Sequence, residues 1–216
     1  EILFKLESAP SFHHPMDPSC AVIFVCTGTG FAPIRGLLQK RLYLQSRGEK
    51  IGPTFLVFGT RSSSEGLFHI EIEEFMKKGV ITKSYMCYSR EPGKVREYTS
   101  NKLGNDRVKR VLAPVLFRAN THIFICGSAT MAEQSKSMLG EMSSSSCVEN
   151  IIAEGRLHCD VFGALSSPKK LQARNTIVEM SSSSYVENTV ADEQLHSDVV
   201  GALPFPKKRH ARTTIF

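Results

Sequence analysis

Continuous apolar runs alternate with helical patterns along the chain up to residue 142. Four runs, each long enough for one buried strand, occupy residues 21–26, 54–58, 81–88 and 121–126. Apolar residues recur at helical spacing over residues 34–47, 66–78, 101–117 and 129–142, and Pro114 interrupts the third of these stretches. This alternation predicts an α/β fold: a doubly wound, mainly parallel sheet with helices on both faces, Rossmann-like and suited to binding a nucleotide.

Two of the apolar runs lead into glycine turns. The first meets Gly28-Thr29-Gly30, and the fourth meets Gly127. A glycine pair after a strand lets the backbone approach a phosphate, and the following helix directs its positive end toward the anion. The same pair also suits a plain tight turn, and the third glycine of the usual dinucleotide fingerprint is absent, so the surrounding motifs must decide.

Beyond residue 140 the pattern gives way to an internal duplication. Residues 141–178 are followed by a near copy in residues 179–216, which shares the segments Met-Ser-Ser-Ser-Ser, Val-Glu-Asn, Gly-Ala-Leu and Pro-Lys-Lys. Two copies are too few to form a solenoid, and Ser-rich and Pro-Lys-Lys segments favour a linker or disorder. We expect the first copy to pack on the domain, and residues 163–216 to form a partly disordered tail.

Composition narrows the classes of function. With 41% hydrophobic and 22% charged residues the chain is typical of a globular protein, and no apolar run reaches the roughly 20 residues of a membrane segment. The net charge of +6 lies mainly before residue 140, which suits an anionic ligand, although a solvated basic surface is an equal alternative. Six scattered Cys indicate free thiols in a reducing compartment, and seven dispersed His predict no metal site.

Four motifs occur in a characteristic order. They are Cys-Thr-Gly-Thr-Gly-Phe-Ala-Pro-Ile-Arg-Gly at 26–36, Phe-Gly-Thr-Arg at 58–61, Tyr-Ser-Arg-Glu at 88–91 and Cys-Gly-Ser-Ala-Thr-Met at 126–131. Over residues 20–162 the chain resembles the NADP-binding domain of the ferredoxin-NADP reductase superfamily. It is most similar to the diflavin branch: microsomal NADPH-cytochrome reductases, sulfite reductase flavoprotein and the reductase halves of nitric oxide synthases. The ending Gly-Arg-Leu-His-Cys-Asp-Val-Phe at 155–162 looks like the close of those enzymes.

The resemblance implies a set of cofactor-binding residues. Thr29 and Arg61 would contact the pyrophosphate, Ser89, Arg90 and Lys94 would bind the 2′-phosphate of NADPH, and Tyr98 would stack on adenine or bind the same phosphate. The rest of the implied set lies in the first and fourth motifs: Gly28, Gly30, Arg35, Gly127 and Ser128.

The resemblance also implies three catalytic residues. Cys126 would stand beside the nicotinamide C4, Asp160 would stabilise charge that develops on the ring, and Phe162 would cover the flavin and move aside for nicotinamide. The chain departs from the family at Cys26, where Gly is usual, and at Ser128, where microsomal reductases often carry Asp.

These expectations give the chain three parts. Residues 1–20 would be the end of a flavin-binding domain and a linker, residues 21–162 the NADP-binding domain, and residues 163–216 the tail. Since the chain opens on Glu1 without Met, we expect a piece of a longer, cytoplasmic or membrane-anchored enzyme whose missing domains hold FAD and FMN. The expected function is to bind NADPH and present its hydride to FAD of the neighbouring domain, for onward transfer to an electron acceptor protein.

Two other readings stay open. A decayed reductase domain would serve as an interaction module that presents the duplicated tail, and such a protein would not prefer NADP over NAD. A nucleic-acid-binding protein would use the basic run Lys207-Lys208-Arg209-His210, but that run is short and lacks interleaved aromatic residues, so no nucleic-acid partner is expected.

Overall fold

The computed structural model describes residues 11–65, 68–143 and 145–163. Residues 1–10 and the tail beyond residue 163 lie outside the described residues. The second copy of the repeat belongs to that tail, so its predicted partial disorder also falls outside them. Among the helices of the described segments, none combines the length and the apolar character needed to cross a membrane.

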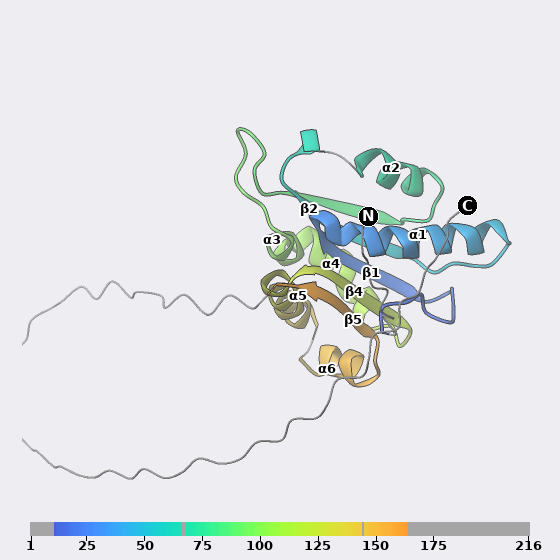
Figure 1. Cartoon of the computed structure of the whole chain (residues 1–216). Coiled ribbons are helices and arrows are strands. Elements are labelled where there is room, and N and C mark those ends of the chain that lie inside the picture. Colours follow the sequence, from blue (N-terminus) through green and yellow to red (C-terminus); the bar gives the residue numbers. More distant parts are fainter. Residues whose placement is uncertain (1–10, 66–67, 144, 164–216) are drawn as a thin grey trace, which may run out of the picture. The chain divides into compact units, whose positions relative to one another are not determined.

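A five-stranded parallel sheet forms the centre of the described domain (Figure 1). Its strand order is β3-β2-β1-β4-β5, and the four pairings between neighbouring strands are all parallel. The strands are β1 (Ala21–Thr27), β2 (Thr54–Thr60), β3 (Lys83–Tyr88), β4 (Thr121–Ser128) and β5 (Leu157–Phe162). The predicted doubly wound α/β fold is confirmed, and β5 belongs to the first copy of the repeat.

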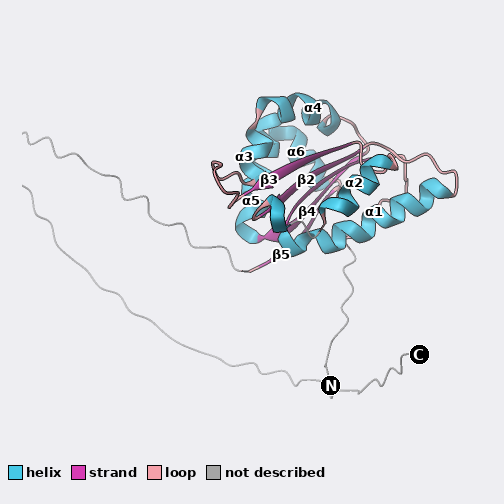
Figure 2. Cartoon of the chain, turned by 90° about the horizontal axis from the view of Figure 1, so that it is seen from above, coloured by secondary structure: helices cyan, strands magenta, loops and turns pink. Residues whose placement is uncertain are grey.

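Helices cover both faces of the sheet (Figure 2). One face packs on α1 (Phe31–Ser46) and α2 (His69–Lys77). The other face packs on α3 (Thr99–Gly104), α4 (Asp106–Leu116), α5 (Ala129–Met142) and α6 (Ser145–Ala153). Two 3₁₀ turns follow strands: η1 (Gly28–Gly30) after β1 and η2 (Ser63–Glu65) after β2.

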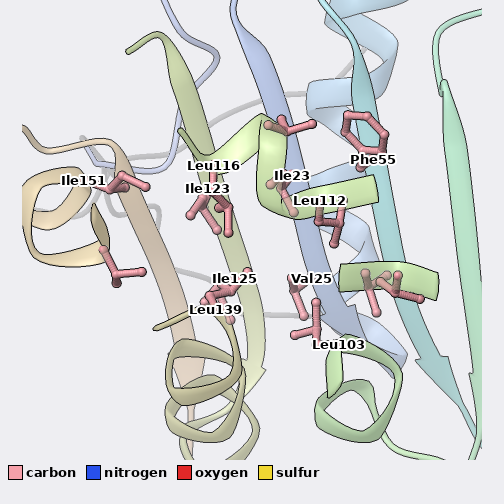
Figure 3. Packing of buried hydrophobic residues seen from close by; sticks show 14 of the residues in the cluster. Ile23, Val25, Phe55, Leu103, Leu112, Leu116, Ile123, Ile125, Leu139 and Ile151 are labelled. Carbon is pink, nitrogen blue, oxygen red and sulfur yellow. The ribbon is translucent and has the colours of Figure 1, made fainter. Parts of the chain in front are cut away.

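The middle positions of the central strands are apolar because both of their sides are buried. Along β1, Phe24 and Cys26 face α1 and α2, whereas Ile23 and Val25 face the opposite helices. Figure 3 shows the second of these two cores, in which side chains of β1, β2 and β4 meet leucines of α3, α4 and α5. Each fully buried aliphatic side chain contributes about 1.5–3 kcal/mol, so the two cores fix the sheet between its helices.

The predicted helix over residues 101–117 is wrong in two respects: the structure divides it into α3 and α4, and α4 continues through Pro114, where an interruption was expected. Asn105 has an extended backbone with ψ of 131°, and its side chain accepts a hydrogen bond from the Arg107 amide at 3.0 Å. It therefore caps α4 as a new helix. The apolar spacing continues across this break, so periodicity alone did not reveal it.

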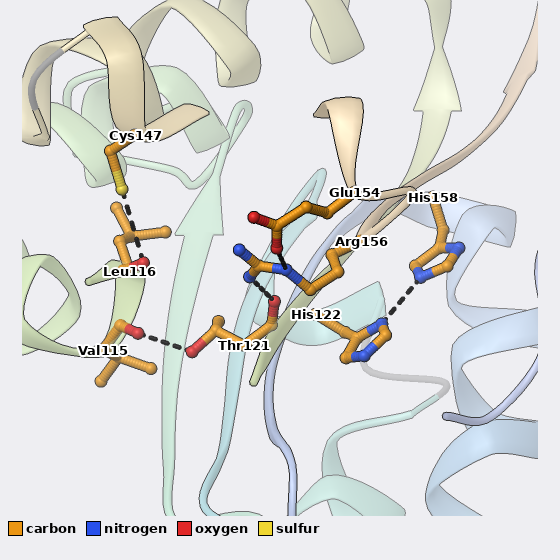
Figure 4. A network of polar contacts seen from close by, with 8 residues as sticks. All are labelled: Val115, Leu116, Thr121, His122, Cys147, Glu154, Arg156 and His158. Atoms are coloured by element: carbon orange, nitrogen blue, oxygen red, sulfur yellow. Dashed lines mark hydrogen bonds and ion pairs between the residues drawn. The ribbon is translucent and has the colours of Figure 1, made fainter. Parts of the chain in front are cut away.

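A polar network ties the beginning of β5 to the beginning of β4 (Figure 4). Arg156 donates to the Thr121 carbonyl at 2.7 Å and pairs with Glu154 at 2.7 Å. The rings of His122 and His158 stack and share a hydrogen bond of 3.0 Å between Nδ1 and Nε2. These contacts lie at the amino ends of the strands, which leaves the carboxyl ends open for a site.

Candidate functional site

A cavity of about 740 Å³ opens at the carboxyl ends of the strands. Seven residues predicted to bind cofactor or act in catalysis line it: Gly28, Thr29, Arg61, Ser89, Tyr98, Ser128 and Phe162. They come from the ends of all five strands and the start of α3. The parallel sheet therefore brings together motifs that are distant in sequence. This volume lies in the range of small-molecule and cofactor sites.

The two glycines of the first turn are required for different reasons. Gly28 has φ of +53°, a left-handed conformation, and a Cβ on it would meet open space. Gly30 is buried against β4, where a Cβ would lie 2.8 Å from the Cys126 carbonyl carbon and 3.3 Å from its Sγ. The turn therefore leaves Gly28 open to the cavity and seats the beginning of α1 directly on β4.

The glycines next to the last residues of β2 and β4 both pack against Thr27. A Cβ on Gly59 would lie 2.9 Å from Thr27 Cγ2 and 3.2 Å from Thr99 Cγ2. A Cβ on Gly127 would lie 2.7 Å from Thr27 Oγ1. Gly127, predicted to bind cofactor, therefore lies behind the cavity lining and allows close packing at its floor.

The loops after β2 and β3 run side by side and carry the basic residues of the site. Ser89 N donates to the Thr60 carbonyl at 3.0 Å, and Arg90 N donates to the Arg61 carbonyl at 2.7 Å. Arg90 and Lys94 are exposed residues outside the cavity lining. In the described part of the chain, neither Arg61 nor Arg90 takes part in an ion pair, so both guanidinium groups are available to an anion.

Arg35 lies outside the lining, although the family motif placed it among the cofactor residues. Its Nε lies 2.7 Å from both carboxylate oxygens of Glu71 on α2. The guanidinium is therefore turned toward α2, and this ion pair competes with any contact to a bound phosphate.

An acidic residue contributes to the lining beside Tyr98. Glu97 lines the cavity, and its Oε2 lies 2.7 Å from Lys102 Nζ. The ion pair compensates the carboxylate charge, which would otherwise oppose an anionic ligand. Tyr98 is exposed at the N-cap of α3 and also lines the cavity.

The three predicted catalytic residues gather where β4 and β5 pair. Cys126 lies opposite Asp160 in the register, and Ser128 lies opposite Phe162. Burial, with a smaller contribution from the Asp160 charge, raises the pKa of the Cys126 thiol to about 11, so it is protonated at neutral pH. Phe162 lines the cavity and is 51% exposed, whereas Cys126 is buried beneath the glycine turn.

Sequence reasoning missed several lining residues. Five lie inside the quoted motifs without an assigned role: Thr27, Gly59, Thr60, Thr130 and Met131. Glu97, Thr99 and Gln134 come from the segment before α3, from α3 and from α5, and nothing in the local sequence distinguishes them from surface positions.

Comparisons with known proteins agree with this geometry. The family model described as "Oxidoreductase NAD-binding domain" matches residues 24–137. The inducible nitric oxide synthase of Gallus gallus is 32% identical over 172 residues, which are 74% of this chain and 15% of that protein. Nitric oxide synthase 3 of Sus scrofa is 38% identical over 129 residues, 59% of this chain and 11% of that protein. The inducible nitric oxide synthase of Homo sapiens is 33% identical over 172 residues, which are 74% of this chain and 15% of that protein.

The resemblance drawn from the four motifs, including its diflavin branch, is confirmed by these matches. The chain spans 15% or less of the length of these three relatives. The activity of a whole relative therefore does not transfer to this chain as a finding.

Proposed function

The chain belongs to the oxidoreductase NAD-binding domain family, and from that premise we propose that it is the NADPH-binding part of a longer flavoprotein reductase. In this proposal a neighbouring FAD domain receives the hydride, and FMN and an acceptor protein receive the electrons afterwards. The described chain supplies the binding, orientation and electrostatics of the nicotinamide cofactor, and not the redox group itself.

The residues around the cavity fit a dinucleotide phosphate. The open space beside Gly28 and the beginning of α1 form a cradle in which backbone amides and the positive helix end favour an anion. Arg61 lies across the cradle at the end of β2 and would bind the pyrophosphate through a charge-assisted fork. Tyr98 would stack against the adenine from the start of α3.

The loop after β3 would provide the preference for NADPH over NADH. Ser89 lines the cavity and Arg90 lies next to the Arg61 backbone, with Lys94 farther along the same loop. A hydroxyl and two cations suit a 2′-phosphate, whereas proteins specific for NAD place an acidic residue on the ribose.

Around the reacting ring, the chain would act through position and charge. The bound cofactor supplies a hydride from its nicotinamide ring. The neutral thiol of Cys126 adds no charge beneath the glycine turn, and the carboxylate of Asp160 on the adjacent strand would stabilise positive charge on the ring. Phe162, which lines the cavity with half of its surface exposed, would cover the flavin and turn aside for nicotinamide.

The single observation that supports this proposal is that Gly28, Arg61 and Ser89 line one cavity. Titration calorimetry of the full chain with NADP⁺ and NAD⁺ tests it. We expect NADP⁺ to bind at least about tenfold more tightly, and Arg90→Ala to remove most of that preference, because one charge-assisted phosphate contact contributes about 1.5–3 kcal/mol.

Arg110→Ala is the matched control, since Arg110 is an exposed arginine of α4 whose Nε donates to the Asp106 carbonyl. It removes the same charge at a position outside the cavity lining and should leave both affinities within about twofold. Equal affinity of the wild-type chain for NADP⁺ and NAD⁺ would contradict the proposal and favour the interaction module.

A further inference from the structure

A clasp outside the cavity lining joins the loop after β2 to the loop after β3. We use the name Ser63–Glu91 clasp for two hydrogen bonds to one carboxylate: the Ser63 amide donates to Glu91 Oε2 and the Ser63 hydroxyl donates to Oε1, each at 2.6 Å. Ser63 begins η2, two residues after Arg61, and Glu91 directly follows Arg90. Each end of the clasp therefore adjoins an arginine assigned to the cofactor.

The clasp continues the connections between the two strands. Beyond the last paired residues of β2 and β3, Ser89 N bonds to Thr60 and Arg90 N bonds to Arg61, and the clasp is the next link outward. Two donors from one residue to both oxygens of one carboxylate fix the orientation of the group as well as its distance. The backbone of Arg90 is thus held on both sides.

We propose that the Ser63–Glu91 clasp is a positioning device for NADP recognition, which holds the Ser89–Arg90 segment at the cavity rim so that its donors converge on the 2′-phosphate. This inference rests on the proposed function. The carboxylate touches no ligand in this role, so Glu91 and Ser63 are positioning residues.

The charge of Glu91 makes the inference testable by the sign of the effect. Its hydrogen bonds from Ser63 hold the pKa of the carboxyl below its usual range, with smaller contributions from Lys94 and His69, so Glu91 is ionised at neutral pH. A negative charge next to Arg90 repels a phosphate dianion. Its removal would therefore tighten NADP⁺ binding if charge alone mattered, and weaken it if position mattered.

The test measures dissociation constants for NADP⁺ and NAD⁺ by titration calorimetry on the full chain. The variants are Ser63→Ala, Glu91→Ala and the double variant, well below their unfolding temperatures. Ser63→Ala removes one bond of the clasp without changing charge. Glu154→Ala is the matched control, because it removes an exposed carboxylate that bonds to Arg156 at 2.7 Å at the opposite ends of the strands.

We expect NADP⁺ to bind about threefold more weakly to Ser63→Ala and about tenfold more weakly to Glu91→Ala, with NAD⁺ changed less than about twofold. The double variant should be no weaker than Glu91→Ala, since both changes break the same contact. Faster amide hydrogen exchange at Ser63 in Glu91→Ala would support loosening of the loop independently of any ligand.

Three results would overturn the inference: unchanged NADP⁺ affinity, tighter NADP⁺ binding in Glu91→Ala, or equal weakening of NADP⁺ and NAD⁺. Each of them leaves the proposed function standing if the wild-type chain still prefers NADP⁺. A wild-type chain without that preference would overturn the proposed function, and the role of the clasp with it.

Discussion

Replacing Gly30 with Ala should damage the fold and the site together. The added Cβ would lie 2.8 Å from the carbonyl carbon of Cys126, closer than real Cβ contacts come, and still closer to its oxygen. Both atoms belong to the backbone of β4, which is paired with β1 on one side and β5 on the other. Because β4 cannot yield, the glycine turn and the beginning of α1 must move away.

The expected loss of stability in Gly30→Ala depends on which atoms the added Cβ would meet. Overpacking a well-filled core costs about 1–3 kcal/mol, and a clash with a fixed backbone belongs at the upper end, so we expect about 3 kcal/mol for Gly30→Ala. For a domain of this size that corresponds to a fall in Tm of about 6–12 °C. The displaced turn would also weaken NADP⁺ binding by more than about tenfold.

Two other glycines separate this contact from general effects of alanine. Gly36 lies on the exposed side of α1 with no atom within 4 Å of its Cβ position, and Gly36→Ala should stabilise the protein by about 0.5–1 kcal/mol. Gly28→Ala meets no atom either but must adopt φ of +53°, so it should cost about 1–2 kcal/mol.

Urea denaturation followed by circular dichroism measures all three variants, and titration with NADP⁺ measures the site. The expected order of stability is Gly36→Ala, wild type, Gly28→Ala and then Gly30→Ala. A Gly30→Ala protein within about 0.5 kcal/mol of the wild type would refute the close approach of the turn to β4.

Two further predictions concern positions outside the cavity. Burial, together with the positive charges of His158, Arg156, His14 and His13, lowers the pKa of His122 to about 4, so the unfolded chain takes up this proton first as the pH falls below 6.5. The free energy of unfolding should therefore decrease by roughly 1–2 kcal/mol between pH 7 and pH 4, a value reduced because the ring is partly exposed. Urea midpoints at several pH values measure this decrease. The same decrease with pH in His122→Gln would contradict the prediction. Arg35→Ala should leave NADP⁺ affinity in calorimetry within about twofold, because its guanidinium pairs with Glu71; a tenfold loss would show that the arginine turns to the cofactor.

The sequence predicted the strands well because a strand that is buried on both faces consists of an uninterrupted run of apolar residues. The segment from Ala21 to Cys26 has no polar residue, and the structure places it at the centre of the sheet. The boundary between α3 and α4 was missed because it depends on one side-chain cap at Asn105 and not on any change in apolar spacing. Local hydrogen bonds of this kind are invisible to periodicity.

The site was predicted as far as its motifs reach. Gly28, Arg61 and Ser89 each come directly after one of three neighbouring parallel strands, so a correct strand order is enough to bring them together. The ion pair of Arg35 with Glu71 joins residues 36 positions apart on two helices, and Gln134 enters the lining through the first turns of α5. Both depend on how helices pack on the sheet, which no short motif records.

Two acidic residues lie at or beside this cavity. Their presence indicates that the positions of the charged groups, and not the net charge of the lining, decide which ligand the cavity binds. Glu97 lines the cavity and Glu91 adjoins Arg90, although uncompensated carboxylates would repel a polyanion. Each carboxylate is already engaged: Lys102 compensates Glu97, and Ser63 binds Glu91 through two donors. Since each is held by its own partner, neither needs a cofactor cation, and Arg61 and Arg90 stay available to phosphate. The acids cost little Coulomb energy across solvent and in return fix the loops from which the cations extend.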